Sequence, residues 1–512
     1  MEPFTPLVAL ASAAGFVFKK MTGPEKSKKG RLGKFLSRRS KIKPGQLQKN
    51  GTGIDLDEIE ELPDYLFIKK LVDAQFPIVF VTGGAGTGKS TFINWLMHHY
   101  SGNVLLAAPT AIAASNIDGK TLHSLFQLPL QWITQKGIKS APYRSDIKNA
   151  RLLIIDEISM VNANLLDGVS AFLRKNRGVD KPFGGLPVIM VGDLFQLPPV
   201  VKPGLMGFYE KFYAGRTKFY AARSLTETSI TYYSVELNQT FRQADKLFVD
   251  VLADIREGRN VGKALEVINS RCQITSTPPP GAVWLAPRRS EVESANRAEL
   301  NKIRGRLFRF QGKVRGDFRG TEDSYPSPVS LELKVGSQVM FTRNDPKKRW
   351  VNGTVGTVVE IGETLSVRTQ PKDTVVEVTR MSWPNFRYVW NKANKMIEKQ
   401  ETGSYSQFPL IHAWAITIHK SQGKTLEKVH LDLGRGAFAF GQTYVALSRC
   451  RELSGLSISR PLNVSDIKVD RESQIFNDHL HDLMEKLPQE KMLEAISYNC
   501  HIYEKGYPRK KS

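Results

Sequence analysis

Short apolar runs without polar interruption recur through the first half of the chain. The four clearest lie at residues 78–81, 104–108, 152–155 and 188–191. Each has the length of a strand, and an unbroken apolar run is typical of a strand buried on both faces of a parallel sheet. Helical spacing follows the first run, so this half of the chain predicts strands and helices alternating around one sheet.

Polar residues follow each run at the point where the strand would end. They are Thr82 with the glycines after it, Pro109 with Thr110, Asp156 with Glu157, and Asp193 with Gln196. The carboxyl ends of parallel strands meet at one edge of an open α/β sheet, and ligands bind at that edge. We therefore expect these side chains to share a site.

The second half of the chain repeats the pattern less regularly. An amphipathic segment at 248–256 is followed by strand-like runs at 283–286, 413–418 and 429–433. Further β-rich runs lie at 355–361, 365–369 and 375–379, after an Asn352-Gly353 turn. The sequence thus predicts a second α/β core interrupted by a small β-barrel.

These patterns divide the chain into five parts. They are a basic arm (1–50), a first core (51–202), a second core (203–344 and 411–470), the inserted β-barrel (345–410), and a C-terminal tail with one helix (471–512). A chain of 512 residues has room for several buried cores, which excludes a single small module.

The chain is strongly basic. Lys and Arg number 73 against 50 Asp and Glu, which gives a formal charge of +23. Residues 1–50 hold 12 of the basic residues and 2 acids, so +10 lies in the arm and +13 in the rest. This surplus favours a polyanionic partner, either nucleic acid or an anionic membrane. Three interpretations of the arm stay open: a solvated disordered segment, an interfacial anchor, or an organelle-targeting segment.

Cysteine content and hydropathy limit the cellular setting. The three cysteines, Cys272, Cys450 and Cys500, have no metal-ligand spacing, which fits a reducing compartment. The longest apolar stretch, residues 7–18, is well short of the roughly 20 residues that cross a bilayer. We expect no stable membrane span.

One glycine-rich segment has the spacing of a phosphate-binding loop between a buried strand and an amphipathic helix. Its residues are Gly83, Gly84, Ala85, Gly86, Thr87, Gly88, Lys89, Ser90 and Thr91. In such a loop the backbone N–H groups face the phosphates, Lys89 supplies a positive charge, and the Ser90 hydroxyl can bind Mg²⁺. The segment predicts a nucleoside triphosphate site.

Two carboxylates and an amide would complete that site. Asp156 is placed to hold Mg²⁺, and Glu157 to orient or deprotonate the attacking water. Gln196, five residues beyond the end of the fourth run, is a candidate contact to the terminal phosphate. Since no second substrate hydroxyl is implied, we expect hydrolysis.

Seven segments in this order and spacing resemble the PIF (petite integration frequency) family of superfamily 1B DNA helicases. They are 81–91, 104–126, 152–160, 181–200, 236–243, 413–425 and 441–451, so the resemblance covers about residues 76–466. It implies two RecA-like cores of a P-loop NTPase with a Src-homology-3-like insertion, and an ATP- and Mg²⁺-dependent motor that unwinds DNA. The resemblance also implies a monomer that moves from 5′ to 3′ on single-stranded and forked DNA.

The family pattern assigns roles to further residues. Arg242 and Arg449 fall at its two arginine fingers, which reach the terminal phosphate from the second core. The resemblance places DNA contacts at Pro109, Thr110, His123, Phe126, His419, Lys420 and Ser421, and a strand-separating wedge at about 127–147. Phosphate contacts carry no sequence information, so no sequence-specific binding is expected. His123 and Phe126 could also be the inner face of a helix.

The chain departs from the family pattern at the adenine-reading glutamine. Gln75 lies only eight residues before Gly83 and fits a loop better, which leaves the base preference open. Other functions also stay open: a translocase stimulated by RNA, one that displaces proteins without strong unwinding, or a nucleotide-switched binding scaffold. We expect a cytoplasmic, nucleoid-associated protein of a bacterium or its phage, with an organellar location or weak membrane association through residues 1–43 as alternatives.

Overall fold

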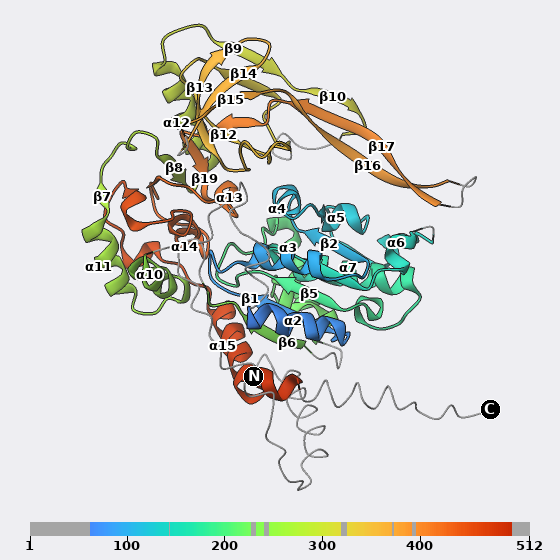
Figure 1. Cartoon of the computed structure of the whole chain (residues 1–512). Helices are drawn as coiled ribbons and strands as arrows, with labels where there is room; N and C mark the ends of the chain where they lie inside the picture. The colour runs from blue at the N-terminus through green and yellow to red at the C-terminus, as the bar shows by residue number, and fades with distance from the viewer. Residues whose placement is uncertain are drawn as a thin grey trace, which may run out of the picture.

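A computed structural model describes residues 62–142, 144–226, 232–239, 245–318, 325–370, 373–391 and 396–493. Two α/β lobes lie side by side, and a β-rich unit stands above them (Figure 1). Residues 1–50 and Arg242, for which the sequence makes predictions, lie outside the described residues.

The first lobe is built on a six-stranded parallel sheet in the order β3-β2-β4-β5-β1-β6. Its strands are β1 (Ile78–Thr82), β2 (Val104–Ala108), β3 (Lys120–Thr121), β4 (Leu152–Ile155), β5 (Val188–Val191) and β6 (Tyr232–Glu236). The four apolar runs are therefore strands, as predicted. Alternate side chains of β1 enter two different cores, Phe80 one and Val81 the other, which is why the run is apolar throughout.

Helices cover both faces of this sheet. They are α2 (Pro63–Asp73), α3 (Lys89–His99), α4 (Ala111–Asn116), α5 (Leu122–Leu125), α6 (Ser145–Lys148), α7 (Ala163–Arg177), α8 (Met206–Tyr213) and α9 (Arg223–Thr226). Asn162 caps the amino end of α7 through its side chain, and Gly178 ends the helix in the left-handed conformation.

The predicted boundary between the cores at residue 203 is wrong. Strand β6 pairs with β1 in parallel, with Tyr232 opposite Ile78, so the chain stays in the first lobe until Glu236. The strand lies at the edge of the sheet and carries polar residues between its apolar ones, so it lacks the unbroken apolar run by which the others were found.

The second lobe has a five-stranded parallel sheet in the order β19-β8-β20-β21-β7. Its strands are β7 (Gln273–Ile274), β8 (Val283–Ala286), β19 (Ala415–Thr417), β20 (Val429–Leu431) and β21 (Leu456–Ile458). Its helices are α10 (Lys246–Glu257), α11 (Val261–Arg271), α12 (Arg289–Lys302), α13 (Ile418–Ser421) and α14 (Gln442–Leu447). The sequence thus predicts this second core correctly.

The insertion is antiparallel and larger than predicted. Its strands are β9 (Phe308–Gln311), β10 (Lys313–Gly316), β11 (Ser330–Leu333), β12 (Gln338–Phe341), β13 (Val355–Ile361), β14 (Leu365–Thr369), β15 (Val375–Val378), β16 (Met381–Asn391), β17 (Met396–Gln407) and β18 (Leu410–His412). Five of them form one sheet in the order β15-β14-β13-β12-β18. A closed barrel stays a prediction.

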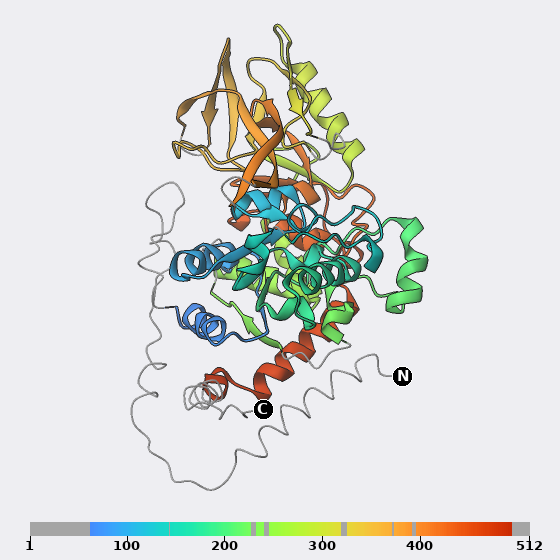
Figure 2. The ribbon, with the colours of Figure 1, turned by 90° about the vertical axis from the view of Figure 1, so that its right-hand side faces the viewer.

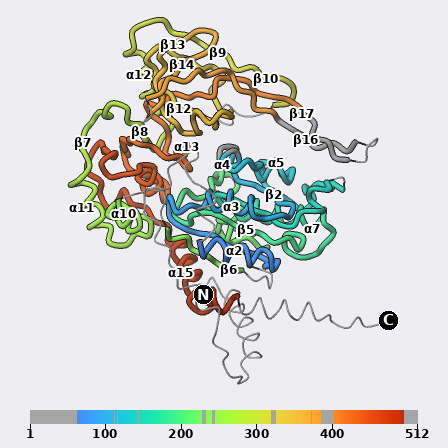
Figure 3. Tube along the Cα trace, viewed as in Figure 1, coloured from blue at the N-terminus to red at the C-terminus, as the bar shows by residue number. Residues whose placement is uncertain are grey.

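The predicted start of the insertion at residue 345 is therefore wrong. Strand β12 ends before that boundary but pairs with β13 and β18, which both follow it, and β9 to β11 also precede it. The long β16–β17 hairpin extends from this unit over the first lobe (Figures 1 and 3).

Helix α15 (Arg471–Lys486) returns to the first lobe and packs on β6 rather than forming a separate tail. Glu472 pairs with Arg216, and Asp470 pairs with Lys218, both partners belonging to the first lobe. Figure 2 shows this helix running beneath the first lobe. The chain therefore crosses between the lobes twice, once after β6 and once before α15.

None of the helices within the described residues has the length and hydropathy required to span a membrane.

Candidate active site between the two lobes

The phosphate loop joins β1 to α3 at the carboxyl edge of the first sheet. Gly83 has a φ of +154°, and a Cβ there would lie 2.6 Å from the Leu237 carbonyl oxygen. Gly88 begins α3 with a φ of +82°, in the left-handed region that other residues rarely adopt. These two glycines allow the tight turn that directs the amide groups of the loop inward.

Lys89 folds back over its own loop. Its Nζ donates to the carbonyl oxygens of Gly83 and Gly84, at 2.7 Å each. A phosphate oxygen is charged and accepts a stronger hydrogen bond than a carbonyl, so a triphosphate can displace these contacts. The exposed Ser90 hydroxyl follows on the first turn of α3, where a metal ion bound to phosphate would reach it.

Asp156 and Glu157 end strand β4 as predicted. Glu157 adopts left-handed backbone angles (φ 50°, ψ 45°), an uncommon conformation for a non-glycine residue, and its N–H donates to Asp156 Oδ1 at 2.9 Å. Burial, followed by the charge of Glu157, raises the pKa of the Asp156 carboxyl to about 7. Two adjacent carboxylates at a buried position fit a divalent cation, which would favour their ionised forms.

A magnesium ion fits this donor set. Mg²⁺ is commonly bound by one or two protein groups together with phosphate oxygens and water, so Ser90 and Asp156 suffice beside a triphosphate. Larger clusters of three or more His, Cys, Asp or Glu side chains are absent from the described ranges.

A series of hydrogen-bonded polar side chains links the two lobes beside Glu157. Gln422, on the second lobe, donates from Nε2 to Glu157 Oε2 at 3.0 Å and to Gln196 Oε1 at 3.2 Å. Gln196 in turn donates to Asp193 Oδ2 at 3.2 Å. Within the described residues, Gln422 Oε1 is buried without a hydrogen-bond partner, so it can accept from a water at this point.

Arg449 lies in the wall of the second lobe with its side chain fully buried. Its Nε donates to a carbonyl one turn earlier in its own segment at 2.8 Å, and its Nη atoms donate to the Lys424 carbonyl and the Ser448 hydroxyl. Burial lowers the pKa of the guanidinium, and the charges of Glu157 and Asp193 across the cleft oppose that effect. Arg449 therefore lies within electrostatic range of the site, although its hydrogen bonds are to its own lobe.

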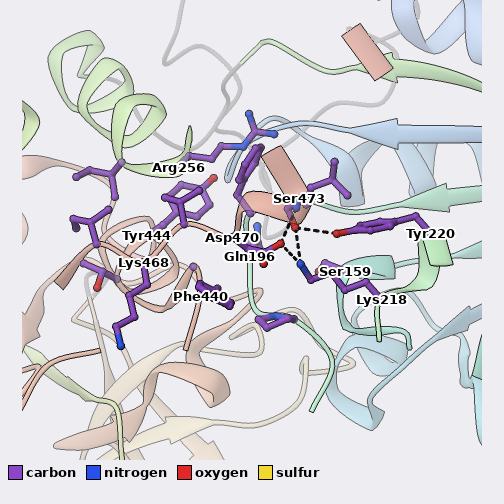
Figure 4. Close-up of a pocket in the computed structure, with 18 of the residues that line it drawn as sticks. Ser159, Gln196, Lys218, Tyr220, Arg256, Phe440, Tyr444, Lys468, Asp470 and Ser473 are labelled. Atoms are coloured by element: carbon purple, nitrogen blue, oxygen red, sulfur yellow. Dashed lines mark hydrogen bonds and ion pairs between the residues drawn. The ribbon is translucent and has the colours of Figure 1, made fainter. Parts of the chain in front are cut away.

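Two further side chains of the second lobe converge on Asp193. Arg256, on α10, donates from Nε to Asp193 Oδ1 at 3.0 Å, and the Tyr444 hydroxyl, on α14, donates to Oδ2 at 2.9 Å. The Tyr444 oxygen also accepts the Ala85 N–H of the phosphate loop at 2.7 Å. Both side chains line the pocket in Figure 4, which lies between the lobes beside Gln196.

Helix α2 contacts the phosphate loop from the other side. The Tyr65 hydroxyl donates to the Gly88 carbonyl oxygen at 2.9 Å. Gln75 lies just beyond this helix and donates to the Val72 carbonyl at 3.3 Å, so its amide is engaged locally.

The predicted DNA residues of the first lobe lie at the same edge of the sheet. Pro109 and Thr110 follow β2, and the Thr110 side chain caps α4 by accepting the Ala113 N–H. His123 is partly buried and contacts the Leu128 carbonyl at 3.3 Å. Phe126 is fully buried and packs edge-on against a phenylalanine of α7, so the prediction that it offers a stacking face to DNA is wrong in this conformation.

The corresponding residues of the second lobe lie on α13. Lys420 is exposed, and the His419 ring stacks on Phe438 with ring centres 6.2 Å apart. Ser421 is fully buried and its hydroxyl donates to the Ile418 carbonyl, so the prediction that this hydroxyl grips DNA is wrong here.

The insertion touches both lobes next to these residues. Asn352 donates to Asn116 Oδ1 of α4 at 3.0 Å and accepts from Lys424 Nζ at 2.7 Å. Burial lowers the pKa of Lys424 to about 8. The turn before β13 thus brings the β-rich unit, α4 and the segment after α13 together.

A family model described as PIF1-like helicase matches residues 66–264. The ATP-dependent DNA helicase Pif1 of Bdellovibrio bacteriovorus is 36% identical over 394 residues, which are 74% of this chain and 83% of that protein. The chain belongs to the PIF1-like helicase family. The human ATP-dependent DNA helicase PIF1 is 33% identical over 396 residues, 74% of this chain, although the chain spans only 58% of that protein.

Solved PIF1-like structures share the fold. Unliganded Pif1 from Bacteroides sp. is 35% identical and superposes with a TM-score of 0.70, over 81% of this chain and 96% of that one. The Bacteroides enzyme in complex with ADP-AlF3 and single-stranded DNA is 34% identical and gives 0.63, over 84% and 98%. The Bacteroides enzyme in complex with ADP-AlF4 gives 0.71, so this chain resembles the unliganded and the ADP-AlF4 structures about equally, and both more than the complex with DNA. The two RecA-like cores predicted from the sequence are confirmed.

Three residues of this site have no role in the sequence-based assignment of the ATP site: Arg256, Gln422 and Tyr444. Asp193 is expected at the site because it follows a strand, but without an assigned role. Gln422 and Tyr444 lie inside two of the seven recognised segments, so the resemblance could have found them. Arg256 ends an amphipathic helix, and nothing in the local pattern distinguishes it from a solvated arginine.

Proposed function

We propose that this chain is an ATP-dependent DNA helicase that binds ATP and Mg²⁺ between its lobes and moves along single-stranded DNA. The observation that carries the proposal is the polar chain from Gln422 to Glu157 and Gln196, because it joins the second lobe to the catalytic edge of the first. Similar proteins of this family are named ATP-dependent DNA helicases.

Each residue of the cleft has a separate role in ATP hydrolysis. Lys89 and the loop amides bind the phosphates, while Ser90 and Asp156 would hold Mg²⁺, which screens the charge of the transferred phosphoryl group. Glu157 orients the attacking water, and Gln196 contacts it or the terminal phosphate. Arg449 supplies positive charge from the opposite lobe, so the rate depends on closure of the cleft. The role of Arg242 as a second arginine finger stays a prediction, because this residue lies outside the described residues.

The DNA path follows the carboxyl edges of both sheets. Support comes from the position of Thr110 after β2 and of His419 and exposed Lys420 after β19. Small hydroxyls and backbone amides grip phosphates without reading bases. Segment 127–147 serves as the wedge that separates the strands, and the β-rich insertion covers the bound strand.

We further infer movement from 5′ to 3′ by a monomer on single-stranded and forked DNA. Bacteroides Pif1 has been solved with single-stranded DNA, and another structure describes two coordinating Pif1 helicases at forked duplex DNA. We place the protein with the nucleoid of a bacterium or its phage, because its substrate is DNA and a bacterial relative exists.

Matched duplexes with either a 5′ or a 3′ single-stranded tail test these proposals together. With ATP and Mg²⁺, the 5′-tailed duplex should be unwound and the 3′-tailed one should not. Unwinding from the 3′ tail alone would reverse the polarity. ATP hydrolysis stimulated by DNA without unwinding would indicate a protein-displacing translocase. Stronger stimulation of ATP hydrolysis by RNA than by DNA would indicate that the protein moves along RNA.

A further inference from the structure

A hydroxyl group of the second lobe contacts the phosphate loop. The Tyr444 oxygen accepts the Ala85 N–H at 2.7 Å, and a Cβ added at Gly84 would lie 3.5 Å from the same oxygen. Tyr444 and Ala85 are 359 residues apart in the chain and belong to different lobes. This is a direct contact between the element that binds phosphate and the lobe that must move.

The same hydroxyl is anchored at its other end by Asp193. Tyr444 donates to Asp193 Oδ2 at 2.9 Å, and all three groups are buried. Burial, followed by the charge of Asp193, raises the pKa of the phenol far above its ordinary value, so the proton that makes this hydrogen bond is retained. The hydroxyl therefore has one donor and one acceptor partner in fixed directions.

Arg256, rather than Tyr444, balances the charge of Asp193. Its guanidinium contacts Asp193 Oδ1 at 3.0 Å and packs over the Phe195 ring at 4.9 Å. Burial alone would raise the pKa of Asp193, but the charges of Arg256 and Lys89 hold it below its ordinary value. Since the ion pair already neutralises Asp193, what the Tyr444 hydroxyl adds is the link to the phosphate loop.

Tyr444 and Arg449 lie on one short rigid segment. Tyr444 is in α14, the Ser448 N–H donates to the Tyr444 carbonyl at 2.9 Å, and the Arg449 N–H donates to the Ala446 carbonyl at 3.2 Å. One end of this segment is thus held against the phosphate loop, and its other end carries the guanidinium assigned to the terminal phosphate.

We propose that Tyr444 is a positioning residue for ATP hydrolysis, whose hydroxyl sets the distance between the phosphate loop and the arginine-bearing end of α14. The inference rests on the proposed helicase function and deepens it. The hydroxyl does not touch the reacting atoms; it fixes the geometry in which Arg449 reaches them. Its loss therefore affects the rate at saturating ATP more than the binding of ATP.

The test is Tyr444→Phe, which keeps the ring and removes only the oxygen. The matched control is Tyr233→Phe, since the Tyr233 hydroxyl makes an equivalent hydrogen bond to the Leu487 carbonyl, outside the site. With saturating single-stranded DNA, we expect Tyr444→Phe to lower kcat at least tenfold while KM for ATP changes less than threefold, and Tyr233→Phe to keep both within twofold. Hydrogen exchange of the loop peptide at 83–88 should be faster in Tyr444→Phe alone.

A kcat within twofold of the wild type, or a rise in KM at constant kcat, would overturn the inference. If Tyr444→Phe does not fold, Asp193→Asn tests the same link, because the amide keeps the volume and weakens the acceptor; unchanged kcat there would also refute it. A wild-type protein without DNA-stimulated ATP hydrolysis would refute the helicase proposal itself. If DNA stimulates ATP hydrolysis by the wild type and the Tyr444→Phe variant has a normal kcat, only the role of Tyr444 is refuted.

Discussion

At the scale of single residues, the ammonium group of Lys89 contacts its own loop, and it must turn away from these contacts to bind a nucleotide phosphate. Two of its hydrogen bonds go to neutral carbonyls of its own loop, and its charge also interacts with the carboxylates of Asp156 and Asp193. Binding of triphosphate exchanges these acceptors for charged ones, which stabilises the same lysine in a new direction.

Lys89→Ala should abolish turnover while DNA binding persists. The loop keeps its backbone, but the charge that stabilises the transferred phosphoryl group is lost, which costs on the order of 100- to 1000-fold in kcat. Phosphate release and fluorescence anisotropy with labelled single-stranded DNA measure the two effects. Lys69→Ala is the control, since Lys69 pairs with Asp73 on the outside of α2. Hydrolysis near the wild-type rate would remove Lys89 from the site.

The sequence predicts those site residues that follow a strand directly. Lys89, Asp156 and Glu157 were found because loop and strand lie together in the chain. Arg256 and Tyr444 could not be assigned in this way, since their partner Asp193 lies 63 and 251 residues away. For Phe126 the sequence leaves two interpretations open, because a buried ring and a DNA-stacking ring share the same spacing beside His123, and only tertiary packing, which buries this ring, distinguishes them.

At the scale of elements, helix α7 holds the predicted wedge segment in place. Asn164 makes two hydrogen bonds with the backbone of Ile133, at 2.9 and 3.0 Å, and Asn176 accepts the Ala141 N–H at 2.6 Å. Both asparagines are buried. A segment with little regular secondary structure is thereby fixed through its main chain.

Asn164→Ala should loosen this segment. It leaves the Ile133 N–H and carbonyl without partners at a cost of about 1–3 kcal/mol. Because the variant leaves the ATP site intact, we expect unwinding to fall severalfold while DNA-stimulated ATP hydrolysis stays within twofold. Asn103→Ala, which removes an exposed hydrogen bond to the Asn149 carbonyl, is the control. Equal loss of both activities in Asn164→Ala would argue against the wedge role.

Element boundaries were harder to predict than the elements themselves. The runs at 355–361 and 365–369 match β13 and β14 to the residue, because alternating burial leaves a clear pattern. Strands β6 and β12 were assigned to the wrong unit, since local periodicity does not say which neighbour a strand pairs with.

At the scale of the whole molecule, the charge of +23 predicts salt-sensitive DNA binding. For roughly six neutralised phosphates on a single strand, raising the salt from about 50 to about 200 mM should weaken binding roughly 300-fold through counterion release. Titrations of labelled single-stranded DNA at several salt concentrations measure this slope. A DNA affinity that is independent of salt would contradict binding mainly through the phosphates of the DNA strand.

The return of α15 to the first lobe limits how the lobes can travel. With covalent connections at two places, after β6 and before α15, relative sliding or twisting would stretch one of them, whereas rotation about the line through both leaves their lengths unchanged. The ion pairs of Asp470 and Glu472 fix one end of that line to the first lobe. We therefore expect the two lobes to open and close about this line rather than to slide past each other.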